Sequence, residues 1–520
     1  MTSKISVSLA AILCAGAASA QDLPQSGNEW FTAAQETVQA VLDRQPNTNR
    51  AKNVIIMISD GNGVGTNYAS RLFAGQQEGG FGDGYVQPQE AFPNLALVKT
   101  YNTNAQTPDS AGTATAMMSG IKTKAGVLGV TDAVVRSDCA TVEGNTVASM
   151  NDVMSDMGKA TGIVTTARVT HATPAAAYAK SADRDWEDSV PDGCTAQKDI
   201  ASQLIDAMEA GTVLVAMGGG RRHFLPEGTA TEEGGEGRRA DGQNLIETAT
   251  GMGAQYVMDQ ETFDAANLDG STPILGLFED SHMQYEADRE GEPSLAEMTG
   301  AAIEALSAAG GDNGFFLQVE AGRVDHANHA GNLARTVRDQ KAFADAVAVA
   351  DEMTDDADTL IVVTADHEHA IAFNGYCGRG SDILGLCMEI NEAAPEALDT
   401  PTLGADGLPY TVAGYLNGAG SVLLEKMPQD DSTSAPADID TGEASADAGA
   451  AVYSGDRSAI EGADVTDLDY LQQALIPMES ETHSGEDVAV YAKGPYAHLF
   501  DGTIEQNVIF HVMYRAATAE

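Results

Sequence analysis

The stretch from Phe315 to His329 constrains the fold of this chain more than any other. Its first part, Phe315 to Val319, is a short aromatic and β-branched run after a glycine-rich turn, which predicts a buried strand. Glu320 then stands at the carboxyl end of that strand, where open α/β sheets carry functional side chains. Asp325 and His329 have helical spacing, so a helix would present both to one divalent ion. Such a pair is more often a solvated surface pair, so its interpretation depends on the rest of the chain.

Two further apolar runs end in residues of the same kind. Residues 53–59 read NVIIMIS, which is typical of a buried parallel strand, and Asp60 follows before a glycine-rich turn. Residues 360–365 read LIVVTA and are followed by Asp366 and His367. The turn after Asp60 lacks the spacing of a dinucleotide-binding loop. The recurring pattern is therefore a strand followed by potential metal ligands.

A serine and an arginine suggest how an anion could be bound. Residues 107–120 predict a helix capped by Asp109, which places Ser110 at its amino terminus, where backbone N–H groups favour an anion. A serine there is usually only part of a cap, and it acts as a nucleophile only if its hydroxyl pKa is lowered. Arg184 lies between two aspartates and is most simply a surface ion pair, but a guanidinium is also the best side-chain clamp for a phosphoryl group.

The charge balance excludes several classes of partner. The chain has 28 Lys and Arg against 77 Asp and Glu, for a net charge of −49, although only 20% of its residues are charged. The acidity therefore comes from a shortage of basic residues. Such a surface repels nucleic acid and anionic membranes, and salt reduces the repulsion between its own charges by screening them. We expect no nucleic-acid-binding surface and a saline setting outside the cytoplasm.

The amino terminus predicts export. Residues 1–20 carry Lys4, an apolar run and a small-residue cleavage site at 18–20, which together form a signal peptide. No later stretch is long and apolar enough to predict a transmembrane anchor. We therefore expect a protein of residues 21–520 released into the periplasm or the extracellular space.

Four cysteines would remain after cleavage, and they allow three disulfide pairings. An oxidising compartment favours disulfides. Cys377 and Cys387 bracket a glycine-rich loop and are the expected partners, which leaves Cys139 to pair with Cys194.

Other segments give a coarse outline of the fold. A short amphipathic helix is expected near residues 30–42 and another helix at 342–353, and residues 428–464 are expected to be a solvated acidic insertion. Residues 221–242 are rich in Gly and Glu and predict an exposed excursion. Further strands are expected at 162–166, 213–217, 275–279 and 488–492.

With these pieces collected, the chain resembles the alkaline phosphatase family in its zinc-dependent serine branch. The matching blocks, in chain order, are DGNG at 60–63, PDSAGTATA at 108–116, VTHATPAAAYA at 169–179, DRDW at 183–186, VEAGRVDHANH at 319–329, TADHEH at 364–369 and ETHSGEDVAVYAKGPYAH at 481–498. The resemblance implies a doubly wound α/β fold whose mostly parallel sheet carries helices on both faces. It further implies one catalytic domain over 21–520, a crown-like insertion at about 390–478, a homodimer, and hydrolysis of small phosphate monoesters.

The resemblance also implies roles for individual residues. Ser110 would be the nucleophile that becomes phosphoserine, and Arg184 would clamp the phosphoryl oxygens. The implied ligands are Asp325, His329 and His483 for one zinc, Asp60, Asp366 and His367 for the other, and Asp60, Thr173 and Glu320 for a magnesium. His171 and His326 would lie just outside these ligands, where some relatives carry an aspartate and a lysine, and this leaves the identity of the third metal open.

A fourth site of the calcium type is a further expectation from the family's animal branch. It would use Glu233, Glu279 and Glu292 with the carbonyl of Phe278, an all-oxygen set that suits calcium. The spacing from Glu279 to Glu292 is shorter than the family pattern.

Two other readings compete with a phosphomonoesterase. A phosphodiesterase or sulfatase of the same superfamily would carry a threonine or a modified cysteine in place of Ser110 and would lack the full third site. A secreted, acidic, calcium-binding matrix or adhesion protein would show acidic repeats, and this sequence shows none.

Overall fold

The computed structural model describes residues 23–426 and 452–519, and the chain divides into two units, Met1–Pro46 and Asn47–Glu520. The first unit contains helix α1 (Glu29–Asp43), which confirms the helix expected near residues 30–42 and has no buried residue. The predicted signal peptide at 1–20 lies outside the described residues, so the domain boundary at residue 21 stays a prediction.

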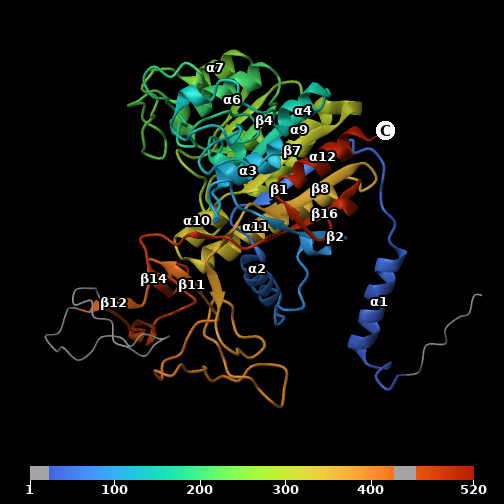
Figure 1. The fold of residues 1–520 in the computed structure, drawn as a ribbon, viewed down its shortest axis with the longest axis vertical. Helices are drawn as coiled ribbons and strands as arrows, with labels where there is room; N and C mark the ends of the chain where they lie inside the picture. Colours follow the sequence, from blue (N-terminus) through green and yellow to red (C-terminus); the bar gives the residue numbers. More distant parts are fainter. Residues whose placement is uncertain (1–22, 427–451, 520) are drawn as a thin grey trace, which may run out of the picture. The chain divides into compact units, whose positions relative to one another are not determined.

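A ten-stranded sheet forms the centre of the second unit (Figure 1). In spatial order its strands are β17 (Thr503–Glu505), β2 (Asn94–Lys99), β16 (Val488–Lys493), β8 (Thr359–Ala365), β1 (Asn53–Ser59), β7 (Phe315–Ala321), β3 (Ala160–Arg168), β4 (Val215–Gly219), β6 (Ile274–Leu277) and β5 (Gln255–Val257). All neighbours pair in parallel except β16, which is antiparallel to both β2 and β8. The predicted mostly parallel sheet is therefore confirmed.

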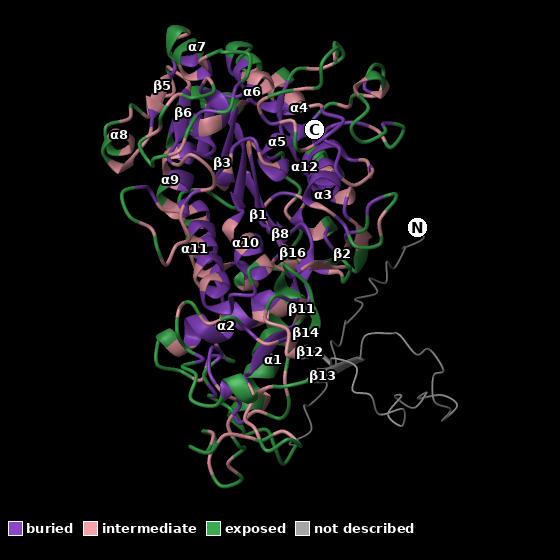
Figure 2. Cartoon of the chain, turned by 90° about the vertical axis from the view of Figure 1, so that its left-hand side faces the viewer, coloured by how far each residue is buried: buried purple, intermediate pink, exposed green. Residues whose placement is uncertain are grey.

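Strand β1 explains why both faces of the sheet must be covered. Ile55 and Met57 belong to one hydrophobic core, whereas Val54, Ile56 and Ile58 belong to the other. Alternate residues of a strand point to opposite faces, so a strand buried on both sides needs a continuous apolar run. Figure 2 shows the central strands as buried along their length.

Helices pack on each face of the sheet, as predicted. One core includes residues of α9 (Leu295–Gly310) and α11 (Leu333–Glu352), and the other includes residues of α3 (Ser110–Ser119), α4 (Met150–Asp156), α6 (Ile200–Glu209), α7 (Leu245–Gly251) and α12 (Val508–Thr518). Helix α11 begins earlier than the predicted residue 342, because the side chain of Asn332 accepts a hydrogen bond from the backbone N–H of Arg335 and caps the helix there.

The interpretation of residues 221–242 as an exposed excursion is wrong in part. Residues Arg221–Phe224 form a short 3-10 helix, and Phe224 is buried. Arg239 is buried as well, 2.9 Å from a carboxylate oxygen of Asp199 and 2.6 Å from one of Asp241. A charged side chain can be buried when it is paired, and composition alone does not reveal the partner.

Smaller sheets lie towards the carboxyl-terminal part of the chain. Strands β10 (Ile371–Phe373), β11 (Ala413–Gly418) and β14 (Ala474–Pro477) form one sheet, and β12 (Leu423–Lys426) pairs with β13 (Val452–Gly455). Residues 427–451 lie outside the described part, so the solvated insertion at 428–464 and the crown-like insertion at about 390–478 stay predictions.

The structure also tests the cysteine pairings. Disulfides join Cys139 to Cys194 and Cys377 to Cys387, which confirms both expected pairs. In the described residues, we find no helix with the length and apolar character needed to cross a membrane.

Candidate metal centre

The centre lies where three neighbouring strands end at the same edge of the sheet. Ser59, the last residue of β1, pairs with Ala321 of β7 on one side and with Ala365 of β8 on the other. The next residues along β1 and β8, Asp60 and Asp366, therefore leave the sheet side by side. The recurring sequence pattern of a strand followed by potential ligands thus converges on one place in the fold.

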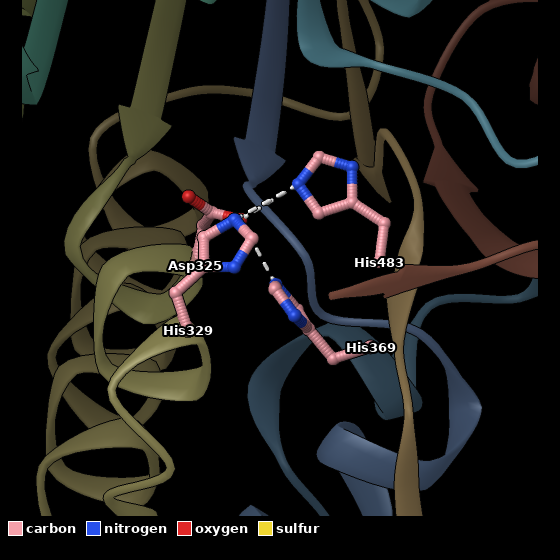
Figure 3. Close-up of side chains that lie close together, drawn as sticks. All are labelled: Asp325, His329, His369 and His483. Atoms are coloured by element: carbon pink, nitrogen blue, oxygen red, sulfur yellow. Dashed lines mark hydrogen bonds and ion pairs between the residues drawn. The ribbon is translucent and has the colours of Figure 1, made fainter. Parts of the chain in front are cut away.

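A first group of potential ligands consists of one carboxylate and three imidazoles (Figure 3). Asp325 and His329 come from one face of helix α10 (Arg323–His329), as their spacing predicts, and lie 3.2 Å apart. His369 and His483 are directly paired residues of β9 (Glu368–His369) and β15 (His483–Ser484), which run antiparallel. One ligand atom from each residue lies within 4.8 Å of the others, which is close enough to share one ion.

His369 is the member of this group that the sequence analysis did not assign. Its Nε2 lies 2.9 Å from Asp325 Oδ1, and its Nδ1 lies 2.6 Å from Glu481 Oε2. Burial alone would lower the pKa of His369, but hydrogen bonds to Asp325 and Glu481 raise it to about 10. The signal in the sequence was its position two residues after the assigned ligand His367, in the block TADHEH.

A second group surrounds the candidate nucleophile. It contains Asp60, Asp325 and His367, and Asp366 Oδ2 lies 3.4 Å from His367 Nε2. The Oγ of Ser110 lies 3.3 Å from His367 Nε2 and 3.5 Å from Asp60 Oδ1. The structure thus brings the predicted serine to the predicted ligands of the second zinc.

The third group contains Asp60, His171 and Glu320. Four buried atoms here have no hydrogen-bond partner within the protein: Asp60 Oδ2, His171 Nδ1, Thr173 Oγ1 and Glu320 Oε1. A buried polar atom without a partner costs about 1–3 kcal/mol, so several of them together fit a bound cation and its water ligands. His171 belongs to this group, whereas the sequence analysis placed it just outside the ligands.

The carboxylates of the centre crowd one another. Burial and the neighbouring charges of Asp325 and Glu320 raise the pKa of Asp60 well above its ordinary value. Burial and Asp60 raise the pKa of Asp366 to about 6, and burial raises that of Glu320 to about 7. Uncompensated negative charge of this kind is what a bound cation relieves, so the donor sets and the electrostatics both fit divalent ions.

The arginine and the helix terminus lie beside the same serine. Helix α3 begins at Ser110, and Asp109 caps it by accepting a hydrogen bond from Gly112 N, as predicted. Arg184 donates to Asp109 Oδ2 at 3.2 Å and to His171 Nε2 at 3.1 Å. A cationic fork therefore faces the amino end of the helix that carries Ser110, where a phosphoryl group would be attracted.

His326 lies behind these groups. Its ring centroid is 5.6 Å from that of His171 and 3.9 Å from that of His282. Burial lowers the pKa of His326 to about 3, so the ring is neutral at physiological pH.

Each of the three carboxylates expected to bind calcium has a partner in the protein, although Glu292 Oε2 is buried without one among the described residues. Glu233 pairs with Arg221 through both oxygens, at 2.6 and 2.8 Å. Glu279 accepts a hydrogen bond from the side chain of Gln284, and Glu292 accepts one from the backbone N–H of Gln284. None of these carboxylates joins the three ligand groups found in the described part of the chain, so the calcium site stays a prediction.

Comparison with known proteins identifies relatives over almost the whole chain. The model of the family described as alkaline phosphatase matches residues 51–519. The tissue-nonspecific alkaline phosphatase of Gallus gallus is 40% identical over 508 residues, which cover 94% of this chain and 89% of that protein. The alkaline phosphatase of Gadus morhua is 40% identical over 513 residues, covering 95% and 97%. The Homo sapiens tissue-nonspecific isozyme is 40% identical over 508 residues, covering 94% and 88%.

Solved structures share the fold at lower sequence identity. The alkaline phosphatase of Thermus thermophilus superposes with a TM-score of 0.62 at 22% identity, covering 93% of this chain and 95% of that one. The enzyme of the Antarctic bacterium TAB5 gives 0.58 at 21% identity, covering 91% and 100%. A mutant of the TAB5 enzyme, with a TM-score of 0.59, contains bound Mg.

Proposed function

Since this chain belongs to the alkaline phosphatase family and is a phosphate-monoester hydrolase, we propose that it works through a phosphoserine formed on Ser110. The observation that carries the proposal is the position of the Ser110 hydroxyl. It lies at the amino end of α3, within 3.5 Å of both His367 and Asp60 and beside Arg184. A hydroxyl becomes a useful nucleophile when an adjacent base or a coordinated metal ion activates it. The imidazole of His367, or a metal ion held by His367 and Asp60, would activate the Ser110 hydroxyl in this way.

We propose two zinc ions and one magnesium ion for the three ligand groups. The ligands are Asp325, His329 and His483 for the first zinc, Asp60, Asp366 and His367 for the second, and Asp60, Thr173 and Glu320 for the magnesium. Bound zinc would supply Lewis acidity, lowering the pKa of a hydroxyl and offsetting charge on the entering and leaving oxygens. Both zinc sets combine imidazole nitrogen with carboxylate oxygen, which suits zinc, and the three proposed magnesium ligands offer only oxygen, which suits magnesium.

The proposed reaction has two steps, in which Ser110 and then water attack the phosphorus. The Ser110 oxygen forms a bond to phosphorus while the bond to the ester oxygen breaks, and the released alcohol takes up a proton. Water then displaces the serine oxygen and frees inorganic phosphate. Arg184 holds two phosphoryl oxygens through both steps, because its fork presents parallel N–H donors.

Two histidines would orient these groups. His369 lies between Asp325 and Glu481 and donates to both carboxylates, so we assign it the role of fixing the Asp325 carboxylate. His171 lies 3.1 Å from Arg184 Nη2 and fixes one arm of the clamp.

We further propose an exported homodimer. The two disulfides and the export pattern of residues 1–20 support a location outside the cytoplasm, in the periplasm or the extracellular space. The homodimer rests on the family resemblance, and light scattering of the purified protein tests it.

Metal analysis combined with substrate comparison tests the proposed function. Purified protein should contain about two zinc ions per chain and should hydrolyse a chromogenic monoester much faster than the matching diester. Preference for the diester would reject the proposal in favour of a phosphodiesterase.

A further inference from the structure

Glu368 lies between His367 and His369 but belongs to none of the three ligand groups of the described residues. It is buried, with 6% of its surface exposed. Its Oε2 accepts a hydrogen bond from Gly65 N at 2.8 Å, and its Oε1 accepts one from Thr66 Oγ1 at 2.9 Å. Both oxygens are thus committed to the first turn of helix α2 (Val64–Gln77).

Helix α2 takes its cap from this distant carboxylate. The residue at its own N-cap position, Gly63, has no side chain to accept a hydrogen bond. A helix amino terminus leaves backbone N–H groups without partners and favours a negative charge, so Glu368 satisfies what the local sequence leaves open.

The same carboxylate fixes the backbone that carries His369. The N–H of His369 donates to Glu368 Oε1 at 3.1 Å, and the N–H of Ala370 donates to Glu481 Oε1 at 2.6 Å. The peptide on each side of His369 is therefore held by a buried carboxylate, which leaves its ring little freedom to turn away from Asp325.

The two segments are also fitted to each other sterically. A Cβ added at Gly63 would lie 2.3 Å from Glu368 Oε2, and one added at Gly61 would lie 2.3 Å from His369 Nε2. The turn that follows Asp60 thus packs directly against β9, with glycines where the side chains of β9 need the space.

From these contacts we propose that Glu368 is a positioning residue for the metal centre, and this rests on the proposed function. It ties the turn after Asp60, which leads into α2, to the strand that carries His369. A shift of the first segment would move the proposed zinc ligand Asp60, and a shift of the second would move His369 away from the proposed zinc ligand Asp325. Partners outside the ligands commonly change metal affinity about 10- to 100-fold.

The experiment compares zinc affinity with stability. Glu368→Ala, Glu368→Gln and Thr66→Val are stripped of metal, zinc affinity is measured by competition with a chromogenic chelator, and unfolding midpoints are recorded without metal. Ser294→Ala is the matched control, because it removes a side-chain cap at a helix that carries none of the proposed ligands. The Ser294 hydroxyl caps α9 by accepting a hydrogen bond from the backbone N–H of Glu297.

We expect Glu368→Ala to weaken zinc binding about 10-fold or more. Glu368→Gln keeps an acceptor for Gly65 N and should restore most of the affinity, and Thr66→Val should fall between the two. Ser294→Ala should lower the unfolding midpoint and leave zinc affinity unchanged.

The proposal is overturned if Glu368→Ala binds zinc as tightly as the wild type, or if Ser294→Ala weakens zinc binding equally. Should Glu368→Ala not fold, an unchanged zinc affinity in folded Thr66→Val overturns it. A wild-type protein that binds no zinc would instead refute the proposed function itself.

Discussion

Ser110 and His367 are distant in sequence, yet the serine Oγ lies 3.3 Å from the imidazole Nε2. His367 is fully buried, and burial lowers its pKa. A neutral imidazole keeps a lone pair for a metal ion or a proton. The pair therefore links the candidate nucleophile to the ligands that would activate it.

Replacing Ser110 by alanine tests this link. Ser110→Ala should abolish labelling of the protein by a phosphomonoester and should lower kcat by about 10³-fold or more, with zinc content unchanged. Acid-quench labelling and metal analysis provide the measurements. Ser119→Ala is the matched control, because Ser119 lies on the same helix and its buried Oγ has no partner. Full turnover in Ser110→Ala would reject the serine as nucleophile.

The phosphate clamp gives a second prediction. Arg184→Ala should raise the inhibition constant for inorganic phosphate by a larger factor than it lowers kcat, because the guanidinium holds oxygens present in substrate and product alike. Arg184→Lys keeps the charge but loses the fork, so its inhibition constant should be intermediate. An inhibition constant equal to that of the wild type in Arg184→Ala would contradict the assignment.

The crowded carboxylates predict how the metal-free protein responds to pH. The pKa values of Asp366 and Glu320 are raised to about 6 and about 7, above the values of an unfolded chain. These two carboxylates therefore bind more protons in the folded protein than in the unfolded chain between about pH 4 and 7, and their contribution to stability falls as the pH rises through that window. Each pH unit removes up to about 1.4 kcal/mol per group. The buried imidazoles of His326 and His367, whose pKa values are lowered, contribute a slope of the opposite sign.

Unfolding midpoints of chelated protein across this pH range check the prediction. Asp366→Asn should remove the contribution of that carboxylate and shift the slope towards stability that rises with pH. Zinc should restore stability most strongly at the alkaline end, because its ligands must lose their protons. A slope that Asp366→Asn leaves unchanged would show that this carboxylate is not held protonated, and chelation without loss of activity would count against the metal centre.

The sequence predicted the central strands better than the segments around them. The run from Asn53 to Ser59 matches β1 at both ends, because a strand buried on both faces needs unbroken apolar residues. Burial of Arg239 could not be read from its segment, since its partner Asp199 is distant in sequence. His369 was missed for a similar reason: its meaning depends on contacts with Asp325 and Glu481 that only the folded chain creates.

The acidic composition predicts a response to salt. With a net charge of −49, self-repulsion destabilises the compact state, and salt shortens its range from about 10 Å at 0.1 M to about 3 Å at 1 M. The unfolding midpoint of zinc-saturated protein should therefore rise between about 0.1 and 1 M NaCl. Calorimetry at constant free zinc provides the measurement, and a midpoint or an activity that does not change with salt would refute the saline interpretation.

The third ligand group makes metal choice depend on one side chain. His171 offers nitrogen to a group otherwise made of Asp60, Glu320 and the hydroxyl of Thr173. Nitrogen favours zinc over magnesium, whereas an added carboxylate favours magnesium. His171→Asp should therefore raise the magnesium content of protein equilibrated with both ions, measured by elemental analysis.

A matched variant separates ligand identity from simple charge. His326→Asp adds the same negative charge beside the centre, but His326 is not a member of the third group. Its magnesium content should stay closer to that of the wild type. Equal magnesium gain in both variants would mean that net charge sets the selectivity, and no gain in His171→Asp would mean that residue 171 does not reach the ion. The contact between His171 and Arg184 adds a second readout, because an aspartate there would pair with the guanidinium and weaken phosphate inhibition.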